Sequence, residues 1–276
     1  MEFDRIYAEV DLGRIEENMK AMKEHLRPGT KMYGVVKTDA YGHGAVPVAR
    51  TIDRFVCGYA VATVDEGLKL RRHGIEKEIL CLGPVSAGRY QECLENDISL
   101  PMFEYQRAKE LSDAAVAEGK TAKIHIAVDT GMSRIGLFPD EGSVETVKEI
   151  AELPALRIAG MFTHFARADE ADKTKAGEQY RRFHAFCDAG KAAGVEVPVC
   201  HCSNSAGIVE LPDFNMDAVR AGITIYGLYP SDEVKQDIIS LKPAMALKSF
   251  ITYIKEIGPG TEVSYGRTLK AEKTMR

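Results

Sequence analysis

Eight short apolar runs, rich in β-branched residues, recur along most of the chain, and helix-like stretches separate most of them. The runs are 32–36, 59–63, 79–82, 98–103, 124–128, 158–162, 197–202 and 219–225. Strands that are apolar throughout and alternate with helices indicate a parallel sheet covered on both faces. Eight such units in about 200 residues favour an α/β fold of the closed (β/α)8 TIM-barrel type over an open sheet.

The main alternative, a doubly wound sheet, requires a glycine-rich turn directly after its first strand. Gly42 and Gly44 stand at that place, but Pro47 occupies the position of the third glycine. The dinucleotide-binding pattern is therefore absent. An additional helix is expected before the first strand, because apolar residues recur at helical spacing behind a possible cap at Asp11.

The pattern changes after Gly227. The segments 246–254 and 261–265 are typical of antiparallel strands around a turn at 258–260. We therefore predict a barrel domain over residues 1–228 and the beginning of a β-rich C-terminal domain over 229–276. About fifty residues are too few to bury a separate core.

Composition excludes several classes of function. No apolar run reaches the roughly 18–20 residues of a membrane-spanning helix, and the first residues lack the basic and apolar regions of a signal peptide. A net charge of −5 without basic clusters argues against nucleic acid as the main partner. The six cysteines include no CxxC pair, so free thiols and a cytoplasmic location are expected. No cluster with metal-ligand spacing occurs, and no metal is expected.

In a barrel, reactive side chains are expected in the loops that follow the strands. Lys37 ends the first apolar run, where partial desolvation would favour reaction with a carbonyl group; a lysine that extends from the barrel mouth to solvent is the simpler alternative. Ser205 follows the seventh run, and Gly222 lies within the eighth. Barrels often bind phosphate at the ends of these two strands. With Arg134 and Arg220, these residues match the needs of pyridoxal phosphate.

Six motifs resemble those of bacterial alanine racemases, in the same order along nearly the whole chain. They are 35–44 (VVKTDAYGHG), 129–136 (DTGMSRIG), 163–165 (THF), 201–206 (HCSNSA), 219–227 (VRAGITIYG) and 263–268 (VSYGRT). The resemblance implies a homodimeric enzyme that interconverts L- and D-alanine, a peptidoglycan precursor, with pyridoxal 5'-phosphate and two bases on opposite faces of the substrate. It also implies that the C-terminal β-domain continues beyond residue 276, so the sequence resembles a truncated racemase.

The resemblance assigns a role to each of nine residues. Lys37 would hold the cofactor as an imine and act as one base, and Tyr265 would be the second base, reaching in from the neighbouring subunit with support from His164. Arg220 would face the pyridine nitrogen, and Arg134 the phenolic oxygen and the substrate carboxylate. The phosphate would be held by Tyr41, Ser205, Gly222 and Ile223.

One position departs from the family pattern. Many members carry a carbamylated lysine two residues before the Asp-Thr-Gly sequence, whereas this chain has Ala127. Arg134 must then be held in another way. Two other functions remain open: a racemase of another small amino acid such as serine, and a non-enzymatic barrel that binds pyridoxal phosphate. A related decarboxylase is disfavoured because the chain has no Gly-Gly pair. His125 lies in no motif, and we expect a surface or packing role for it.

Overall fold

The computed structural model describes residues 5–276, so the prediction about the extreme N-terminus falls partly outside the described residues. The chain divides into two compact units. The barrel unit is Asp11–Ala244, and the β unit combines the described residues up to Val10 with Met245–Arg276.

The barrel unit contains eight parallel strands that pair in chain order and close on themselves, which confirms the predicted fold class. Closure comes from the pairing of the first strand with the last, in the register Lys31↔Ala218. The strands are β2 (Lys31–Val35), β3 (Gly58–Val61), β4 (Glu78–Cys81), β5 (Ile98–Met102), β6 (Ala122–Ala127), β7 (Leu156–Phe162), β8 (Cys200–His201) and β9 (Ala218–Ala221).

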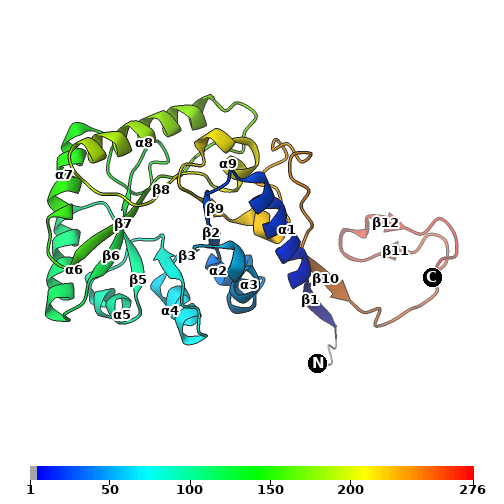
Figure 1. Ribbon diagram of the computed structural model, residues 1–276. Coiled ribbons are helices and arrows are strands. Elements are labelled where there is room, and N and C mark those ends of the chain that lie inside the picture. Colours follow the sequence, from blue (N-terminus) through cyan, green and yellow to red (C-terminus); the bar gives the residue numbers. More distant parts are fainter. Residues whose placement is uncertain (1–4) are drawn as a thin grey trace. The chain divides into compact units, whose positions relative to one another are not determined.

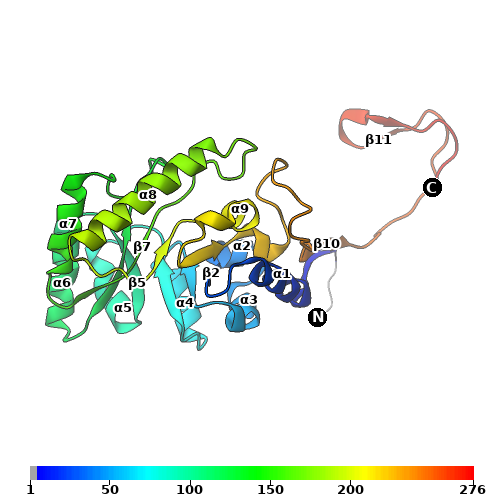
Figure 2. The same ribbon diagram turned by 45° about the horizontal axis from the view of Figure 1, so that its top comes forward.

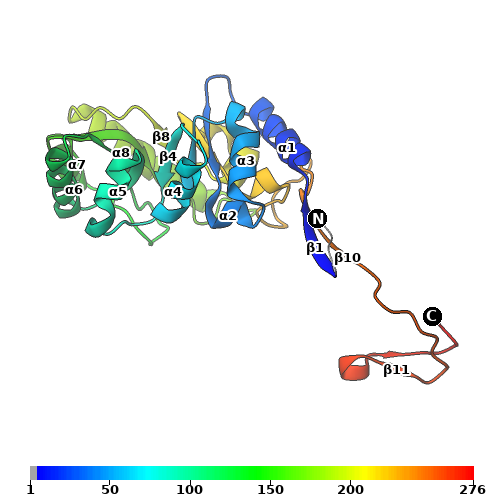
Figure 3. The ribbon, with the colours of Figure 1, turned by 90° about the horizontal axis from the view of Figure 1, so that it is seen from below.

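Helices connect the strands and form an outer layer, visible from below in Figure 3 and along α8 in Figure 2. They are α2 (Lys37–Tyr41), α3 (Ala45–Ile52), α4 (Val64–Arg72), α5 (Tyr90–Glu95), α6 (Tyr105–Ala117), α7 (Glu141–Ala151), α8 (Thr174–Ala192) and α9 (Ser205–Glu210). Short 3-10 turns add η1 (Asp53–Phe55), η2 (Ala87–Arg89), η3 (Pro212–Phe214) and η4 (Ile223–Tyr226). None of the described helices is both long and apolar enough to cross a bilayer.

The additional helix predicted before the first barrel strand is α1 (Leu12–His25). The Asp11 side chain caps it by accepting a hydrogen bond from the Arg14 backbone N–H at 3.1 Å. Ile15, Met19 and Met22 on its apolar face are completely buried. At about 25 cal/mol per Å² of apolar area, each such side chain contributes roughly 1.5–3 kcal/mol to the stability of the packed helix.

Polar side chains fill part of the barrel interior, where Val, Ile and Leu usually dominate. Glu78 accepts a hydrogen bond from the Tyr33 hydroxyl at 2.7 Å and lies 3.1 Å from His125. His125 in turn contacts His201, and His201 contacts Arg220. This continuous polar chain distinguishes the centre of the barrel from the apolar layer between strands and helices.

The β unit contains two small antiparallel sheets. β1 (Ile6–Val10) pairs with β10 (Met245–Ser249), and β11 (Glu262–Val263) pairs with β12 (Leu269–Lys270). The predicted strands at 246–254 and 261–265 are thus shorter than expected, and η5 (Tyr265–Arg267) follows β11.

The barrel unit extends beyond residue 228 to Ala244. Within the segment 229–244, Lys242 is bound by Asn18 of α1. Its side-chain amide donates to the Lys242 carbonyl at 2.9 Å and accepts from the Lys242 N–H at 2.8 Å. The first strand of the chain joins the β unit instead, a pairing between distant segments that local sequence patterns do not reveal.

Candidate active site

A cavity of about 740 Å³ opens where the barrel strands end. Its lining includes eight of the nine predicted site residues: Lys37, Tyr41, Arg134, His164, Ser205, Arg220, Gly222 and Ile223. The structure therefore brings together residues that lie up to 186 positions apart in the sequence. The ninth, Tyr265, lies in the β unit, where η5 begins and its side chain is fully exposed.

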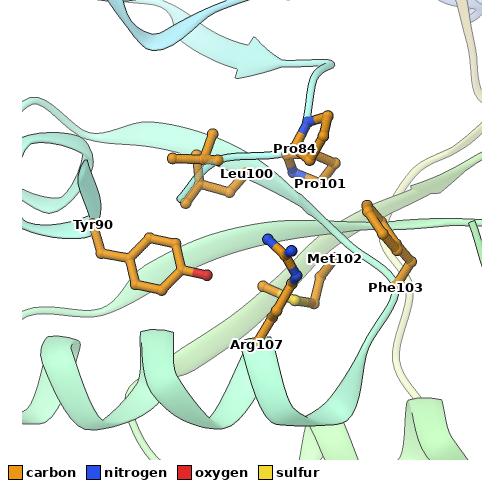
Figure 4. Close-up of a pocket in the computed structure, with 8 residues that line it drawn as sticks. Pro84, Tyr90, Leu100, Pro101, Met102, Phe103 and Arg107 are labelled. Carbon is orange, nitrogen blue, oxygen red and sulfur yellow. The ribbon is translucent and has the colours of Figure 1, made fainter. Parts of the chain in front are cut away.

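A second hollow lies beside β5 and α6, between Tyr90, Leu100, Met102 and Arg107 (Figure 4). Its volume is about 10 Å³. That is at the lower limit for a single water molecule. We therefore place the chemistry in the large cavity.

The segment α2, which begins at Lys37, is a left-handed turn of backbone and not a right-handed helix. The four residues after Lys37, Thr38 to Tyr41, all have φ between 51° and 57°, and Gly42 follows at 85°. Residues other than glycine rarely adopt this left-handed conformation, which costs roughly 1–2 kcal/mol per residue. The turn carries two predicted site residues, with the Lys37 amine 5.8 Å from the centre of the Tyr41 ring. Strain of this kind is typical of functional sites.

Two carboxylates hold this turn. Glu66 of α4 accepts hydrogen bonds from the backbone N–H groups of Thr38 at 2.6 Å and Ala62 at 2.7 Å. Asp39 accepts one from the Ala45 backbone at 2.9 Å and pairs with Lys69 at 2.7 Å. These bonds lower the pKa of Asp39, so it stays ionised. Glu66 was not predicted as a site residue, although Thr63 and Glu66 have the spacing of a capping box.

The predicted phosphate seat is formed by α9, η4 and the lysine turn. The Ser205 hydroxyl accepts hydrogen bonds from the N–H groups of Gly222 at 3.0 Å and Thr224 at 3.4 Å. A Cβ atom at Gly222 would lie 3.4 Å from this hydroxyl and 3.5 Å from the Tyr41 hydroxyl. Two hydroxyls and the start of a helical turn therefore surround one small space, and only glycine leaves it open.

Arg220 is almost completely buried at the end of β9. All five of its hydrogen bonds come from the two terminal nitrogens, to the carbonyls of Thr163, His201 and Cys202 and to the rings of His164 and His201. Its Nε–H has no partner among residues 5–276. Burial lowers the pKa of Arg220 to about 10, so it remains a cation at neutral pH.

His164 lies between these cations at the end of β7. Burial, with the charges of Arg220, Arg134 and Lys37, lowers its pKa to about 3. Its ring is therefore neutral at physiological pH. Since Arg220 can only donate, the Nδ1 atom of His164 accepts that hydrogen bond at 3.2 Å, and the proton resides on Nε2.

The loop that carries Arg134 is organised by Asp129 and by Gln179 of α8. Asp129 accepts hydrogen bonds from the N–H groups of Gly131 and Ser133. The Gln179 amide donates to the Thr130 hydroxyl at 3.2 Å and to the His164 carbonyl at 3.0 Å. Arg134 itself has no hydrogen bond or ion pair within the described chain. Gln179 was not predicted, because a polar residue on an otherwise ordinary helix carries no local signal.

The chain matches the family description "Alanine racemase, N-terminal domain" over residues 10–230. An alanine racemase of Clostridium perfringens is 43% identical over 272 residues, which cover 98% of this chain and 70% of that protein. The chain belongs to the alanine racemase family.

Solved structures of the alanine racemase family have the same architecture. The alanine racemase of Clostridium difficile matches with a TM-score of 0.94 at 38% identity, covering 99% of this chain and 72% of that one. An alanine racemase from Bacillus anthracis with bound L-Ala-P matches with a TM-score of 0.87 at 35% identity, covering 99% of this chain and 71% of that one. The predicted family membership is thus confirmed.

Proposed function

We propose that this member of the alanine racemase family interconverts L- and D-alanine with pyridoxal 5'-phosphate. One observation carries the proposal: a lysine, a space bordered by two hydroxyls beside Gly222, and a buried arginine meet in a single cavity. Relatives named alanine racemase, 40–44% identical over most of the chain, support the choice of substrate.

The residues around the cavity fit the proposed cofactor. Glycine at 222 leaves open a space bordered by two hydroxyls. Ile223 is the first residue of η4, a position whose N–H has no partner within the helix. Lys37, Arg134 and Arg220 supply three positive charges around the same cavity, which suits a phosphorylated, anionic ligand.

The cofactor, when bound, would delocalise the electron pair released when the α proton of the substrate is removed. Lys37 would hold it covalently, while Tyr41, Ser205, Gly222 and Ile223 would bind its phosphate. Arg220, with a pKa of about 10, would face the ring nitrogen without giving up a proton to it. Arg134 would bind the substrate carboxylate.

Inversion at Cα requires removal of a proton on one face and its return on the other. Lys37 would serve one face. We assign the other to Tyr265 of a second copy of the chain, so that the working unit is a homodimer. His164, neutral and protonated at Nε2, would support Tyr265 by hydrogen bonding. We also propose that the protein is located in the cytoplasm.

The cofactor assignment is tested by absorbance and by covalent trapping. Pyridoxal phosphate added to the protein should give an imine band, and borohydride reduction with peptide mapping should find the label on Lys37. Lys37→Ala should lose the band, whereas Lys20→Ala, on the exposed face of α1, should retain it. A label on another lysine would refute the assignment.

The substrate is tested by chiral analysis of L-alanine and L-serine after incubation with the loaded protein. We expect faster formation of D-alanine. A preference for serine would support the alternative racemase. Cofactor binding without exchange of the α proton of either amino acid would support a non-enzymatic binding barrel.

A further inference from the structure

A chain of four ionisable side chains crosses the barrel interior and ends at Arg220. We call Glu78, His125, His201 and Arg220 the interior relay. Glu78 Oε1 lies 3.1 Å from His125 Nε2, His125 Nδ1 lies 3.1 Å from His201 Nε2, and His201 Nδ1 lies 2.7 Å from Arg220 Nη1. Both histidines are completely buried, which excludes bulk water as an alternative partner.

The two ends of the relay fix the direction of every hydrogen bond in it. A guanidinium can only donate, so His201 Nδ1 must accept from Arg220, and the proton of His201 resides on Nε2. His201 therefore donates to His125 Nδ1, and His125 carries its own proton on Nε2. An ionised carboxylate can only accept, so His125 donates to Glu78. Both histidines are neutral in this pattern.

The backbone provides room for His125 in this position. The pairing of β6 with β7 shifts register between Ile124 and His125, where Ile124↔Ile158 is followed by His125↔Gly160. Such bulges redirect side chains and are common beside active sites. A Cβ atom at Gly160 would lie 2.5 Å from His125 Nδ1, closer than atoms can approach. Glycine at 160 is therefore needed for the ring to lie where the relay requires it.

Glu78 supplies the negative end of the relay. It is the first residue of β4, at the end of the strands opposite the cavity. Burial favours its neutral form, but hydrogen bonds from His125, Tyr33 and Ser99 oppose burial and lower the pKa of Glu78 below its ordinary value. Arg220 has no carboxylate partner of its own within residues 5–276. The carboxylate that hydrogen bonds connect to the positive charge of Arg220 is thus Glu78, with the rings of His125 and His201 between them.

We propose that Glu78 and His125 are positioning residues for Arg220, acting on it from the opposite end of the barrel. Arg220 fixes the tautomers from one end and Glu78 from the other. The carboxylate accepts the Nε2–H of His125, His125 Nδ1 accepts from His201, and His201 offers an unprotonated Nδ1 to the guanidinium. This holds Nη1 in place and leaves Nε–H free for a ligand in the cavity. The inference deepens the proposed function, because the ring nitrogen of pyridoxal phosphate is the group that Arg220 would face.

The first test uses the cofactor-free protein and so does not depend on racemase activity. ¹⁵N NMR of the imidazoles should show both His125 and His201 neutral, with Nδ1 unprotonated. In Glu78→Met the acceptor of the His125 Nε2–H is lost, and His125 should become a mixture of tautomers. Glu78→Gln keeps an acceptor oxygen and should restore the wild-type pattern. The matched controls Tyr33→Phe and Ser99→Ala remove other bonds of Glu78 and should leave His125 unchanged.

The second test uses the loaded protein. Because Arg220 faces the cofactor and not the substrate, Glu78→Met should lower kcat for alanine at least tenfold and change KM less than threefold. The kcat of Glu78→Gln should fall between that of Glu78→Met and that of the wild type.

Two results would overturn the relay: a cationic or Nδ1-protonated His201 in the wild type, or an unchanged His125 in Glu78→Met. If Glu78→Met changed kcat and KM by equal factors and kept the wild-type tautomers, the role of Glu78 would be merely structural. Correct tautomers in a protein that does not racemise alanine would instead refute the proposed function and leave the relay standing.

Discussion

Glu66 is expected to stabilise the left-handed turn that positions Lys37. Four consecutive residues other than glycine in this conformation cost about 4–8 kcal/mol at 1–2 kcal/mol each. Glu66 opposes this cost with its hydrogen bonds from Thr38 at 2.6 Å and Ala62 at 2.7 Å. Hydrogen bonds to a charged group contribute about 1.5–3 kcal/mol each. Because Glu66 is only partly buried, the lower end of that range applies.

Glu66→Ala should therefore lower the free energy of unfolding by about 2–3 kcal/mol. Glu66→Gln keeps one acceptor oxygen but turns an amide donor toward a backbone N–H, so we expect a loss of similar size. Urea unfolding measures both. Glu76→Gln is the control, because Glu76 is exposed and has no hydrogen bond within the described chain.

Glu66→Ala and Glu66→Gln should also slow the reaction of Lys37 with pyridoxal phosphate, measured by the growth of the imine band. The reason is that the amine is presented by a turn that Glu66 no longer holds. If Glu66→Ala unfolds like the Glu76→Gln control and reacts at the wild-type rate, Glu66 does not support the turn, and the strain is balanced elsewhere.

Three further outcomes are expected. Gly222→Ala should weaken binding of pyridoxal phosphate at least tenfold by filling the proposed phosphate seat, whereas Gly258→Ala, which meets no atom within 4 Å, should bind as the wild type does in a fluorescence titration. The pKa of His164 is about 3 when folded and near 6.5 when unfolded, so the unfolded chain binds more protons between these values. Unfolding free energy should thus fall as the pH drops from 6.5, less steeply in His164→Gln; equal slopes would contradict the lowered pKa. Gly136→Ala places a Cβ 2.5 Å from the Asp129 backbone at a φ of +124° and should lower the melting temperature, whereas Gly142→Ala on helix α7 should leave it unchanged or raise it.

The architecture of the barrel could be predicted because each strand and helix has a local signature. The eight apolar runs correspond to β2 through β9. The strand ends pointed to Lys37, Ser205 and Gly222, with Arg134 and Arg220, whereas Tyr41, His164 and Ile223 came from the family resemblance. Once eight parallel strands close, their carboxyl ends must meet at one mouth. The convergence of these side chains then follows from topology alone.

Other features depend on contacts between distant residues and left no local pattern. His125 was expected at the surface or in packing, yet it is completely buried in a chain of hydrogen bonds that includes residues of three other strands. A single histidine within an apolar run does not show whether a polar partner faces it. The strained turn after Lys37 was also not predicted, because Asp39 is the one residue among Thr38 to Tyr41 whose type favours positive φ.

The pairing of β1 with β10 has a consequence for the order in which the protein folds. Each barrel strand pairs with the next one in the chain until β9 returns to β2, whereas Ile6 pairs with Ser249. During synthesis at about 5–20 residues per second, β1 leaves the ribosome roughly 12–50 s before its partner. The barrel strands emerge one after another in that interval, while β1 is an unpaired edge that other strands can bind.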